Sequence, residues 1–315
     1  MAPPAYARLT RFALWALAAI VVTGVSVRLT GSGLGCEDWP TCSEDRFVAD
    51  LEYHALVEFV NRLFTGFVAI AVMAAVLGSW RRRPRRADLI TLSLGLVAGV
   101  LAQIGLGALL VKTELDPRFT MGHFLLSMVL LQNAAVLDVR ARSDIEAAGA
   151  AGRPRGSTTT GRLPDGTTRL MLWAVLVVGG ALLVTGTLVT GAGPHAGDTR
   201  AERLPLLVRE VARIHSIVAL ILLGMVVWTW WRLRASGSAG HVRMGRIAVL
   251  LAAQGAVGYT QYFTGVPVLL VGVHVTLASI TWIEIVKAAH DPATGAARRA
   301  ESDPVDGVPM VGVQP

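Results

Sequence analysis

The segment from Arg169 to Gly191 reads RLMLWAVLVVGGALLVTGTLVTG, and after its first residue it carries no charged side chain. A helix needs roughly 20 apolar residues to cross the hydrocarbon core of a bilayer. Lipid offers no hydrogen-bond partner to backbone N–H and C=O groups, so a segment of this kind has to be helical. The stretch therefore predicts one membrane-spanning helix over 169–191.

Similar apolar runs occur along the whole 315-residue chain, at 11–28, 54–80, 89–112, 120–140, 205–232, 246–263 and 268–290. Charged residues make up 16% of the sequence, against about 25% in soluble proteins. No small-residue cleavage site follows the first run, so we do not expect it to be a removable signal peptide. We predict an all-α polytopic membrane protein with eight transmembrane helices.

The distribution of charge predicts the orientation. The chain has a net charge of +7. If its N-terminus is cytoplasmic, most of the 29 Lys and Arg residues fall in inner segments, as the positive-inside rule requires. Both termini are then cytoplasmic, and loops 29–53, 113–119, 192–204 and 264–267 are outside. The basic residues thus fit a membrane lipid partner, and we expect no nucleic acid partner.

The chain divides into two halves. Residues 141–168 are rich in Gly, Ser, Thr and Arg and predict a cytoplasmic linker between a first bundle, 1–140, and a second, 169–290; the tail 291–315 is expected to be disordered. Gln103, Gly107 and His123 recur as Gln254, Gly258 and His274 at one constant offset, and the segment beginning T23-G resembles the one beginning T185-G. We therefore predict two pseudo-symmetric four-helix bundles related as parallel repeats.

Four histidines, His54, His123, His215 and His274, lie near the predicted outer ends of helices, and we expect their imidazoles to lie at comparable depth. Ionisable groups in a membrane usually face the bundle interior and have a function, although a single such His is more often structural. Two imidazoles from facing helices can hold a haem iron, whereas zinc needs further ligands nearby. The pattern favours haem between His215 and His274.

Other residues near the outer ends leave alternatives open. His195 either lines the site or serves a turn, and Arg28 and Arg213 either bind haem propionates or anchor the helices at the interface. His54, Glu58 and Asn61 share one helix face, while Glu58 and Arg62 have the spacing of an ion pair. Glu58 therefore fits proton handling as well as a structural pair with Arg62.

The only two cysteines, Cys36 and Cys42, lie in the first outer loop. An oxidising compartment makes a disulfide plausible, and two unpaired thiols are the alternative.

Three strings carry a family resemblance: V27-RLTGSGLGCEDWPT-C42, the segment E58-FVN-R62, and G186-TLVTGAGPHAG-D198. With the two late histidines they resemble haem A synthases. The resemblance implies a bacterial cell-membrane oxidoreductase that converts haem O to haem A by oxidising a ring methyl to a formyl group through successive hydroxylations. It implies a haem b cofactor (iron) on His215 and His274. It also implies haem O in the first half with catalytic Glu58 and ligand His123, and a loop pair of Cys36 and Cys42.

The resemblance also implies partners, namely a haem O synthase and an electron donor of unknown identity; a homo-oligomer is left open. One position departs from the family, because Asn61 stands where the family has a histidine ligand just before Arg62. Either His54 replaces that ligand, or the first-half iron is bound by His123 alone. The alternative function is a diheme b-type membrane cytochrome that transfers electrons from quinol.

Overall fold

The computed structural model describes residues 1–36, 41–42, 48–49, 51–151 and 165–295. Within them the chain forms eight α-helices and no strand. The helices are α1 (Pro3–Leu29), α2 (Tyr53–Arg81), α3 (Ala87–Lys112), α4 (Pro117–Ala151), α5 (Gly166–Ala192), α6 (Val208–Ala235), α7 (Gly240–Phe263) and α8 (Val268–His290). The predicted all-helical fold is confirmed.

Seven of the described helices are long and apolar enough to span a membrane. The exception is α7, whose 24 residues include Arg243, Arg246, Gln254 and Gln261. However, α7 packs against both α6 and α8, and four-residue loops join it to each of them. A helix held alongside two spanning helices by such short loops runs at the same depth, so the chain is a multi-pass membrane protein.

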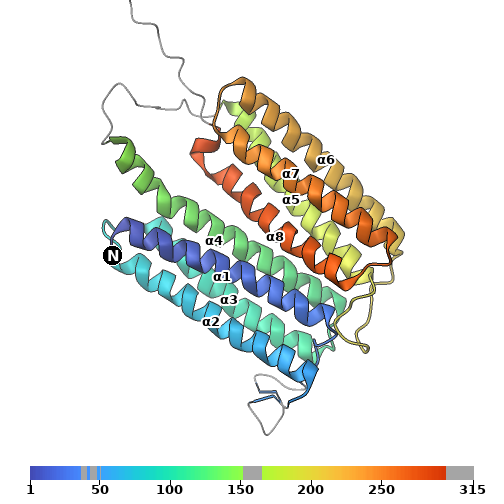
Figure 1. Cartoon of the computed structure of the whole chain (residues 1–315). Coiled ribbons are helices and arrows are strands. Elements are labelled where there is room, and N and C mark those ends of the chain that lie inside the picture. Colours follow the sequence, from blue (N-terminus) through green and yellow to red (C-terminus); the bar gives the residue numbers. More distant parts are fainter. Residues whose placement is uncertain (37–40, 43–47, 50, 152–164, 296–315) are drawn as a thin grey trace, which may run out of the picture.

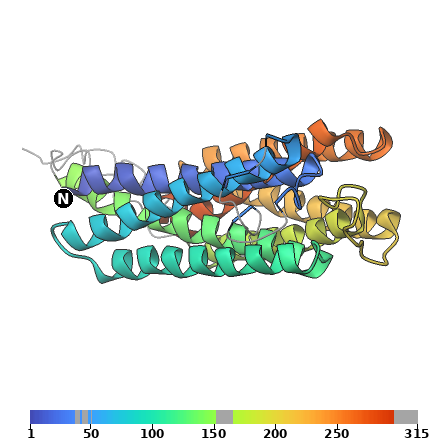
Figure 2. The same ribbon diagram turned by 90° about the horizontal axis from the view of Figure 1, so that it is seen from below.

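The helices form two four-membered rings (Figure 1). In the first ring α1 contacts α2, α2 contacts α3, α3 contacts α4, and α4 returns to α1; α5 to α8 repeat this order. Between the rings, α4 packs on α8, α1 on α8, and α4 on α5. Exchanging α1 with α5 and α4 with α8 leaves this set of contacts unchanged, as two parallel repeats require. The view from below shows the helices running side by side along one common direction (Figure 2).

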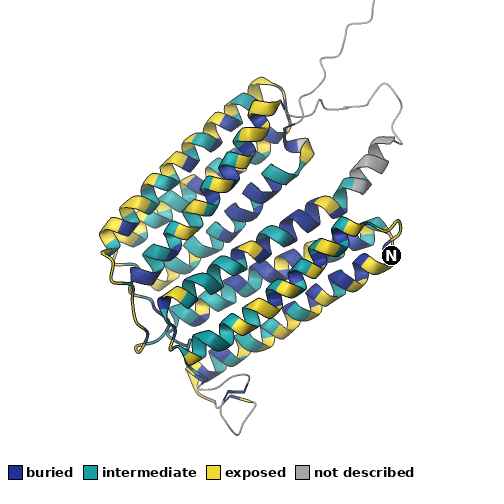
Figure 3. Ribbon diagram, turned by 180° about the vertical axis from the view of Figure 1, so that it is seen from behind, coloured by how far each residue is buried: buried dark blue, intermediate teal, exposed yellow. Residues whose placement is uncertain are grey.

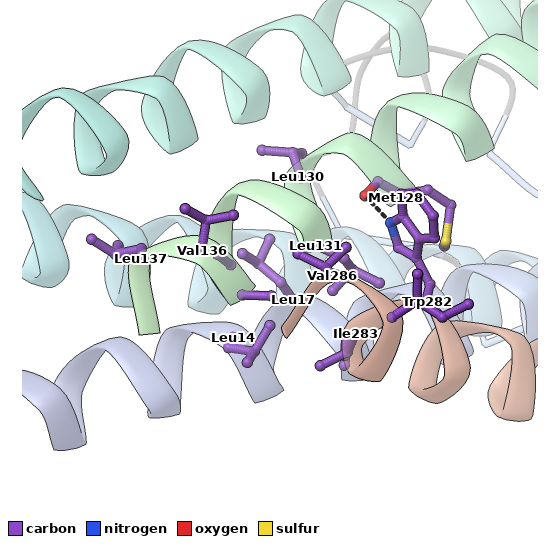
Figure 4. Packing of buried hydrophobic residues seen from close by; sticks show 14 of the residues in the cluster. Leu14, Leu17, Met128, Leu130, Leu131, Val136, Leu137, Trp282, Ile283 and Val286 are labelled. Atoms are coloured by element: carbon purple, nitrogen blue, oxygen red, sulfur yellow. Dashed lines mark hydrogen bonds between the residues drawn. The ribbon is translucent and has the colours of Figure 1, made fainter. Parts of the chain in front are cut away.

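The best-buried part of the molecule is the junction between the rings, formed by α1, α4 and α8 (Figure 3). Leu14, Leu131 and Ile283, one from each helix, are at most 1% exposed and pack into a single core (Figure 4). Across the same junction Trp282 Nε1 donates a hydrogen bond to the Met128 carbonyl at 2.9 Å. The two rings therefore pack directly against each other and are not connected by the linker alone.

Large aliphatic side chains cover the outer faces of the helices. Ile70, Val177 and Val249 are each about 70% exposed. Isolated exposed apolar residues are ordinary in soluble proteins, but faces of this extent need an apolar solvent. Lipid supplies that solvent, which agrees with the predicted class.

The structure changes the predicted limits of the linker and the tail. Helix α4 continues to Ala151 and α5 begins at Gly166, so residues 141–151, expected in the linker, are helical. Their sequence, ARSDIEAAGAA, is rich in alanine, which has the highest helix propensity. In the tail, Pro292–Thr294 forms a short 3₁₀ turn that contacts α7 and α8. Residues 152–164 and 296–315 lie outside the described residues.

Candidate functional site

Two histidines of the second bundle face each other. His215 lies on α6 and His274 on α8, with ring centres 6.4 Å apart and ring planes at 63°. An imidazole nitrogen sits about 2.0–2.1 Å from a bound transition metal and about 1.1 Å from its own ring centre, so rings on opposite sides of one iron have centres roughly 6.3 Å apart. The observed spacing therefore fits a pair of axial ligands to a single iron.

Hydrogen bonds set the orientation of the His215 ring. Thr185 Oγ1 lies 3.0 Å from His215 Nδ1 and also 3.0 Å from the Leu182 carbonyl. Because the hydroxyl has one proton and donates it to that carbonyl, its oxygen accepts the proton on Nδ1. This leaves the Nε2 lone pair for a metal, and ligating histidines usually have such a partner on their other nitrogen.

Gln254 of α7 holds His274 in place. With its amide turned so that both atoms have partners, Nε2 donates to His274 Nδ1 at 3.0 Å and to the His274 carbonyl at 3.1 Å, and Oε1 accepts from the Ala278 N–H at 2.8 Å. The three bonds fix the amide against α8 and so limit rotation of the His274 ring.

Glycines make room for both rings. A Cβ atom at Gly186 would lie 3.1 Å from His215 Cε1, and one at Gly258 would lie 3.3 Å from His274 Cε1. Both distances are shorter than ordinary carbon contacts. Any larger residue would displace the imidazoles, which explains why the repeated segments carry glycine at these two points.

The first bundle reproduces half of this arrangement. Gln103 Nε2 donates to the His123 carbonyl at 3.1 Å, as Gln254 does to the His274 carbonyl, and a Cβ at Gly107 would lie 3.9 Å from His123 Cε1. His123 Nδ1 is buried and has no hydrogen-bond partner among the described residues. His123 thus occupies the position in the first bundle that His274 occupies in the second.

Asn61 occupies the position of the other ligand. Thr23 Oγ1 lies 2.9 Å from Asn61 Oδ1 and 3.2 Å from the Ile20 carbonyl. The pairs of residues correspond to Thr185 with His215 and with the Leu182 carbonyl, but Thr23 donates to Asn61 Oδ1 whereas Thr185 accepts from His215 Nδ1. Thr23-Gly24 is the sequence counterpart of Thr185-Gly186. Neither threonine was predicted as a site residue, although the repeated Thr-Gly pair was the signal that could have identified both.

His54 lies elsewhere. It is the second residue of α2, is exposed, and has Nδ1 2.9 Å from Ser32 Oγ in the first loop. Seven residues separate it from Asn61, which is about 10.5 Å along a helix axis. The expectation that four histidines share one depth is therefore corrected: His54 stands at the rim, because α2 begins at Tyr53 and its first turn faces the loop.

Glu58 joins α2 to the first loop. The carboxylate is 6% exposed; its Oε2 accepts from the Cys36 N–H at 2.8 Å, and its Oε1 accepts from Arg62 Nη2 at 2.5 Å. Arg62 Nη1 in turn donates to the Thr41 carbonyl at 2.8 Å. The expected Glu58–Arg62 ion pair is confirmed, and it holds both sides of the loop that carries the cysteines.

The predicted disulfide between Cys36 and Cys42 is confirmed. Its loop belongs to a larger assembly at this end of the molecule, where Leu34, Leu115, Ala196 and Ala201 form an apolar cluster. Gly33 N–H also donates to the Gly197 carbonyl at 3.0 Å. Three of the four loops predicted on the outer side thus meet each other.

Arg28 and His195 connect the two halves at the same end. Arg28 Nε donates to the His195 carbonyl at 2.7 Å and Nη2 to the Thr190 carbonyl at 3.2 Å. His195 Nε2 donates to the Val266 carbonyl at 2.8 Å, which brings in the fourth loop. Both residues therefore make structural contacts. Arg213 is exposed on α6, and a propionate role for it or for Arg28 stays a prediction.

Asp198 is the last residue of the 186–198 motif, and its side chain stabilises the loop that follows α5. It accepts hydrogen bonds from Arg200 N at 2.9 Å and from Arg200 Nε at 3.1 Å. Partial burial raises the pKa of Asp198, but the bonds from Arg200 outweigh this effect and hold the pKa below its ordinary value. The carboxylate is therefore charged at neutral pH and keeps the turn after Gly197 closed.

Together these features define a polytopic helical membrane protein with a paired-imidazole site in one bundle and a related, modified site in the other. The family model COX15-CtaA, described as cytochrome oxidase assembly protein, matches residues 7–286. The chain belongs to this family.

Individual relatives show the same similarity. A heme A synthase of Symbiobacterium thermophilum is 27% identical over 249 residues, which cover 76% of this chain and 79% of the relative. Heme A synthases of Geobacillus kaustophilus and Lysinibacillus sphaericus are 32% and 29% identical. The matches to these two span 33% and 40% of this chain, and only 32% and 43% of the relatives' lengths.

Proposed function

We propose that this protein is a haem A synthase, an oxidoreductase that converts haem O to haem A. The observation that carries the proposal is the His215–His274 pair, whose ring spacing of 6.4 Å fits axial ligation of one haem iron. Membership of the COX15-CtaA family and the names of the relatives support the same activity and favour it over the alternative of a diheme cytochrome oxidising quinol.

The second bundle holds the resident cofactor in this proposal. His215 and His274 would bind a b-type haem, while contacts with Thr185 and Gln254 hold their rings. A haem with two imidazole ligands supplies one-electron transfer. The residues present suit that task, because the rings are preoriented and glycines leave them space.

The first bundle receives the substrate, haem O, with His123 on one side of its iron. Glu58 is the proposed catalytic acid near the ring methyl that becomes a formyl group. Two hydroxylations, each using one dioxygen and two electrons from the donor, would give a gem-diol that loses water. A carboxylate that is buried, paired with Arg62 and attached to the Cys36 N–H keeps a fixed position. The disulfide loop that it anchors then lies over the substrate end of the bundle.

Orientation and partners complete the proposal. The excess of arginine at the end where α4 and α8 finish supports a bacterial cell membrane location with both termini cytoplasmic. The loops with Cys36 and His195 are then outside. A haem O synthase supplies the substrate, and a separate donor supplies electrons.

The test uses bacterial cells that make haem O but no haem A. Expression of this chain should yield haem A by pigment extraction and chromatography. Glu58→Ala and Glu58→Gln should both abolish haem A while leaving the low-spin spectrum of the second bundle intact. Glu58→Gln retains an acceptor for Cys36 N–H, so it separates the acid from its structural contact.

Glu210→Ala is the matched control, because Glu210 is an exposed acid in the first turn of α6. It should leave haem A formation unchanged. If the wild-type chain binds haem but haem O alone persists, the protein is an electron carrier and not a synthase.

A further inference from the structure

The two bundles bring corresponding residues into contact, and this makes the difference between His215 and Asn61 informative. In the second bundle Thr185 contacts the Leu182 carbonyl and His215; in the first, Thr23 contacts the Ile20 carbonyl and Asn61. Ile20 and Leu182 each lie three residues before the threonine. Asn61 therefore faces Thr23 as His215 faces Thr185.

An asparagine at this position is too short to reach a metal. In histidine, Nδ1 lies one bond beyond Cγ and Nε2 lies two bonds beyond it, whereas the asparagine amide ends one bond beyond Cγ. The amide thus places an oxygen, Oδ1, where the histidine has Nδ1, and it has no counterpart of the ligating Nε2.

The space beside Gly24 and Gly186 also differs between the two bundles. A Cβ at Gly186 would meet three atoms of the His215 ring, the nearest at 3.1 Å, whereas a Cβ at Gly24, its counterpart, would meet no atom within 4 Å. No side chain therefore lies against Gly24 in the way that the His215 ring lies against Gly186. His54 does not lie there either, because its ring contacts Ser32 in the loop two helical turns away.

We propose that Asn61 leaves the second axial position of the substrate iron open, so that the first bundle binds a haem through His123 alone. The inference rests on the proposed function, since it concerns the same substrate site. An open axial position admits a small neutral ligand, and a bis-imidazole site does not. The two halves of one duplicated fold then differ in coordination: the second is closed, and the first is open to a diatomic molecule.

The experiment uses the full-length protein, purified in mild detergent and loaded with iron protoporphyrin IX. The wild type should bind two haems, one low-spin and one high-spin by electron paramagnetic resonance, and after reduction one of them should bind carbon monoxide. Asn61→His should convert the high-spin signal to low-spin and abolish carbon monoxide binding. The persisting second-bundle spectrum shows that this variant is folded.

Two further variants serve as matched controls. His215→Asn transfers the first-bundle arrangement to the second and should create a second high-spin site. His54→Ala should leave both signals unchanged. Two low-spin haems in the wild type would overturn the inference while leaving the haem sites of the proposed function standing, and a high-spin signal that appears only in His54→Ala would assign the ligand to His54. Binding of a single haem would instead contradict the proposed substrate site.

Discussion

Asp138 of α4 is the residue whose removal should most weaken the junction between the two bundles. Its side chain is fully buried and lies 3.1 Å from Lys287 Nζ of α8, 3.1 Å from Arg142 Nη2, and 3.8 Å from Arg11 Nε of α1. The side chains of these partners are 11%, 26% and 52% exposed. The two arginines can turn toward solvent, but Lys287 cannot do so without moving α8.

Asp138→Asn keeps the size of the side chain and removes its charge. Removing one partner of a buried ion pair costs about 3–5 kcal/mol, because the other charge stays buried without compensation. Most of the cost here should come from Lys287, which has the least access to water of the three cations. We therefore expect Asp138→Asn to lower the free energy of unfolding by about 3–5 kcal/mol, and the double variant Asp138→Asn/Lys287→Met to recover more than half of that loss.

The assay is equilibrium unfolding of the purified protein in mixed micelles, followed by circular dichroism and tryptophan fluorescence. Asp88→Asn is the matched control, because Asp88 also pairs with an arginine, Arg86, at 2.6 Å, but both side chains are about one-quarter to one-third exposed. An exposed pair contributes about 0–1 kcal/mol. Equal losses for Asp138→Asn and Asp88→Asn, or a double variant no more stable than Asp138→Asn, would refute the assignment of the junction to this buried charge.

Four further predictions concern the sites and loops. Gly186→Ala should displace the His215 ring and shift the second-bundle haem spectrum, whereas Gly24→Ala, which meets no atom within 4 Å, should not. Gln254→Leu removes the hydrogen bond to His274 Nδ1 and should weaken haem binding about 10–100-fold in a titration, as loss of such partners typically does. Arg28→Met leaves the His195 carbonyl without its side-chain donor and removes one of the two donors to the Thr190 carbonyl, and it should lower the free energy of unfolding by about 1–3 kcal/mol. The pKa of Asp198 is lowered, so its contribution to the stability of the loop is fully present above the unfolded pKa of about 3.9 and is lost as pH falls through the folded pKa. Proteolysis of the 193–207 loop should therefore accelerate only in strong acid. Asp198→Asn should make cleavage fast at every pH.

The sequence predicted most of the fold, because its signals are local. Apolar length alone identifies spanning helices, and a constant offset between Gln103, Gly107, His123 and their counterparts identifies the repeat. Those three residues lie on adjacent helices joined by a short loop, so their spacing along the chain carries over into space. The same locality explains the correct disulfide between Cys36 and Cys42.

Contacts between helices that are distant along the chain were not predictable in this way. The rotation of α2 against α1 decides that Thr23 meets Asn61, and no periodicity in either helix specifies it. Glu58, His54 and Asn61 share one helix face, yet each has a different partner, because the first loop folds over the start of α2 and takes Glu58 and His54. The predicted start of the linker at residue 141 was wrong. A polar composition shows that a segment lies outside the membrane but does not exclude a helix, and the alanines in 141–151 favour a helix that continues beyond the membrane-spanning part.

The proposed haem sites would differ in one ligand while their surroundings stay alike. Thr23 and Gly24 correspond to Thr185 and Gly186, although the first bundle has no imidazole at Asn61 for Thr23 to orient. Electron transfer between the two proposed haems would need a fixed separation between the bundles. Arg28 and Gly33 clamp the bundles at the loop end, and Asp138 with Lys287 clamps them at the opposite end. The contacts of Arg28 and Gly33 join the end of α1 and its loop to α5 and the loop that follows α5, whereas Asp138 and Lys287 join α4 to α8, the helices that carry His123 and His274. The second clamp therefore acts directly on the two helices that would hold the proposed haem irons.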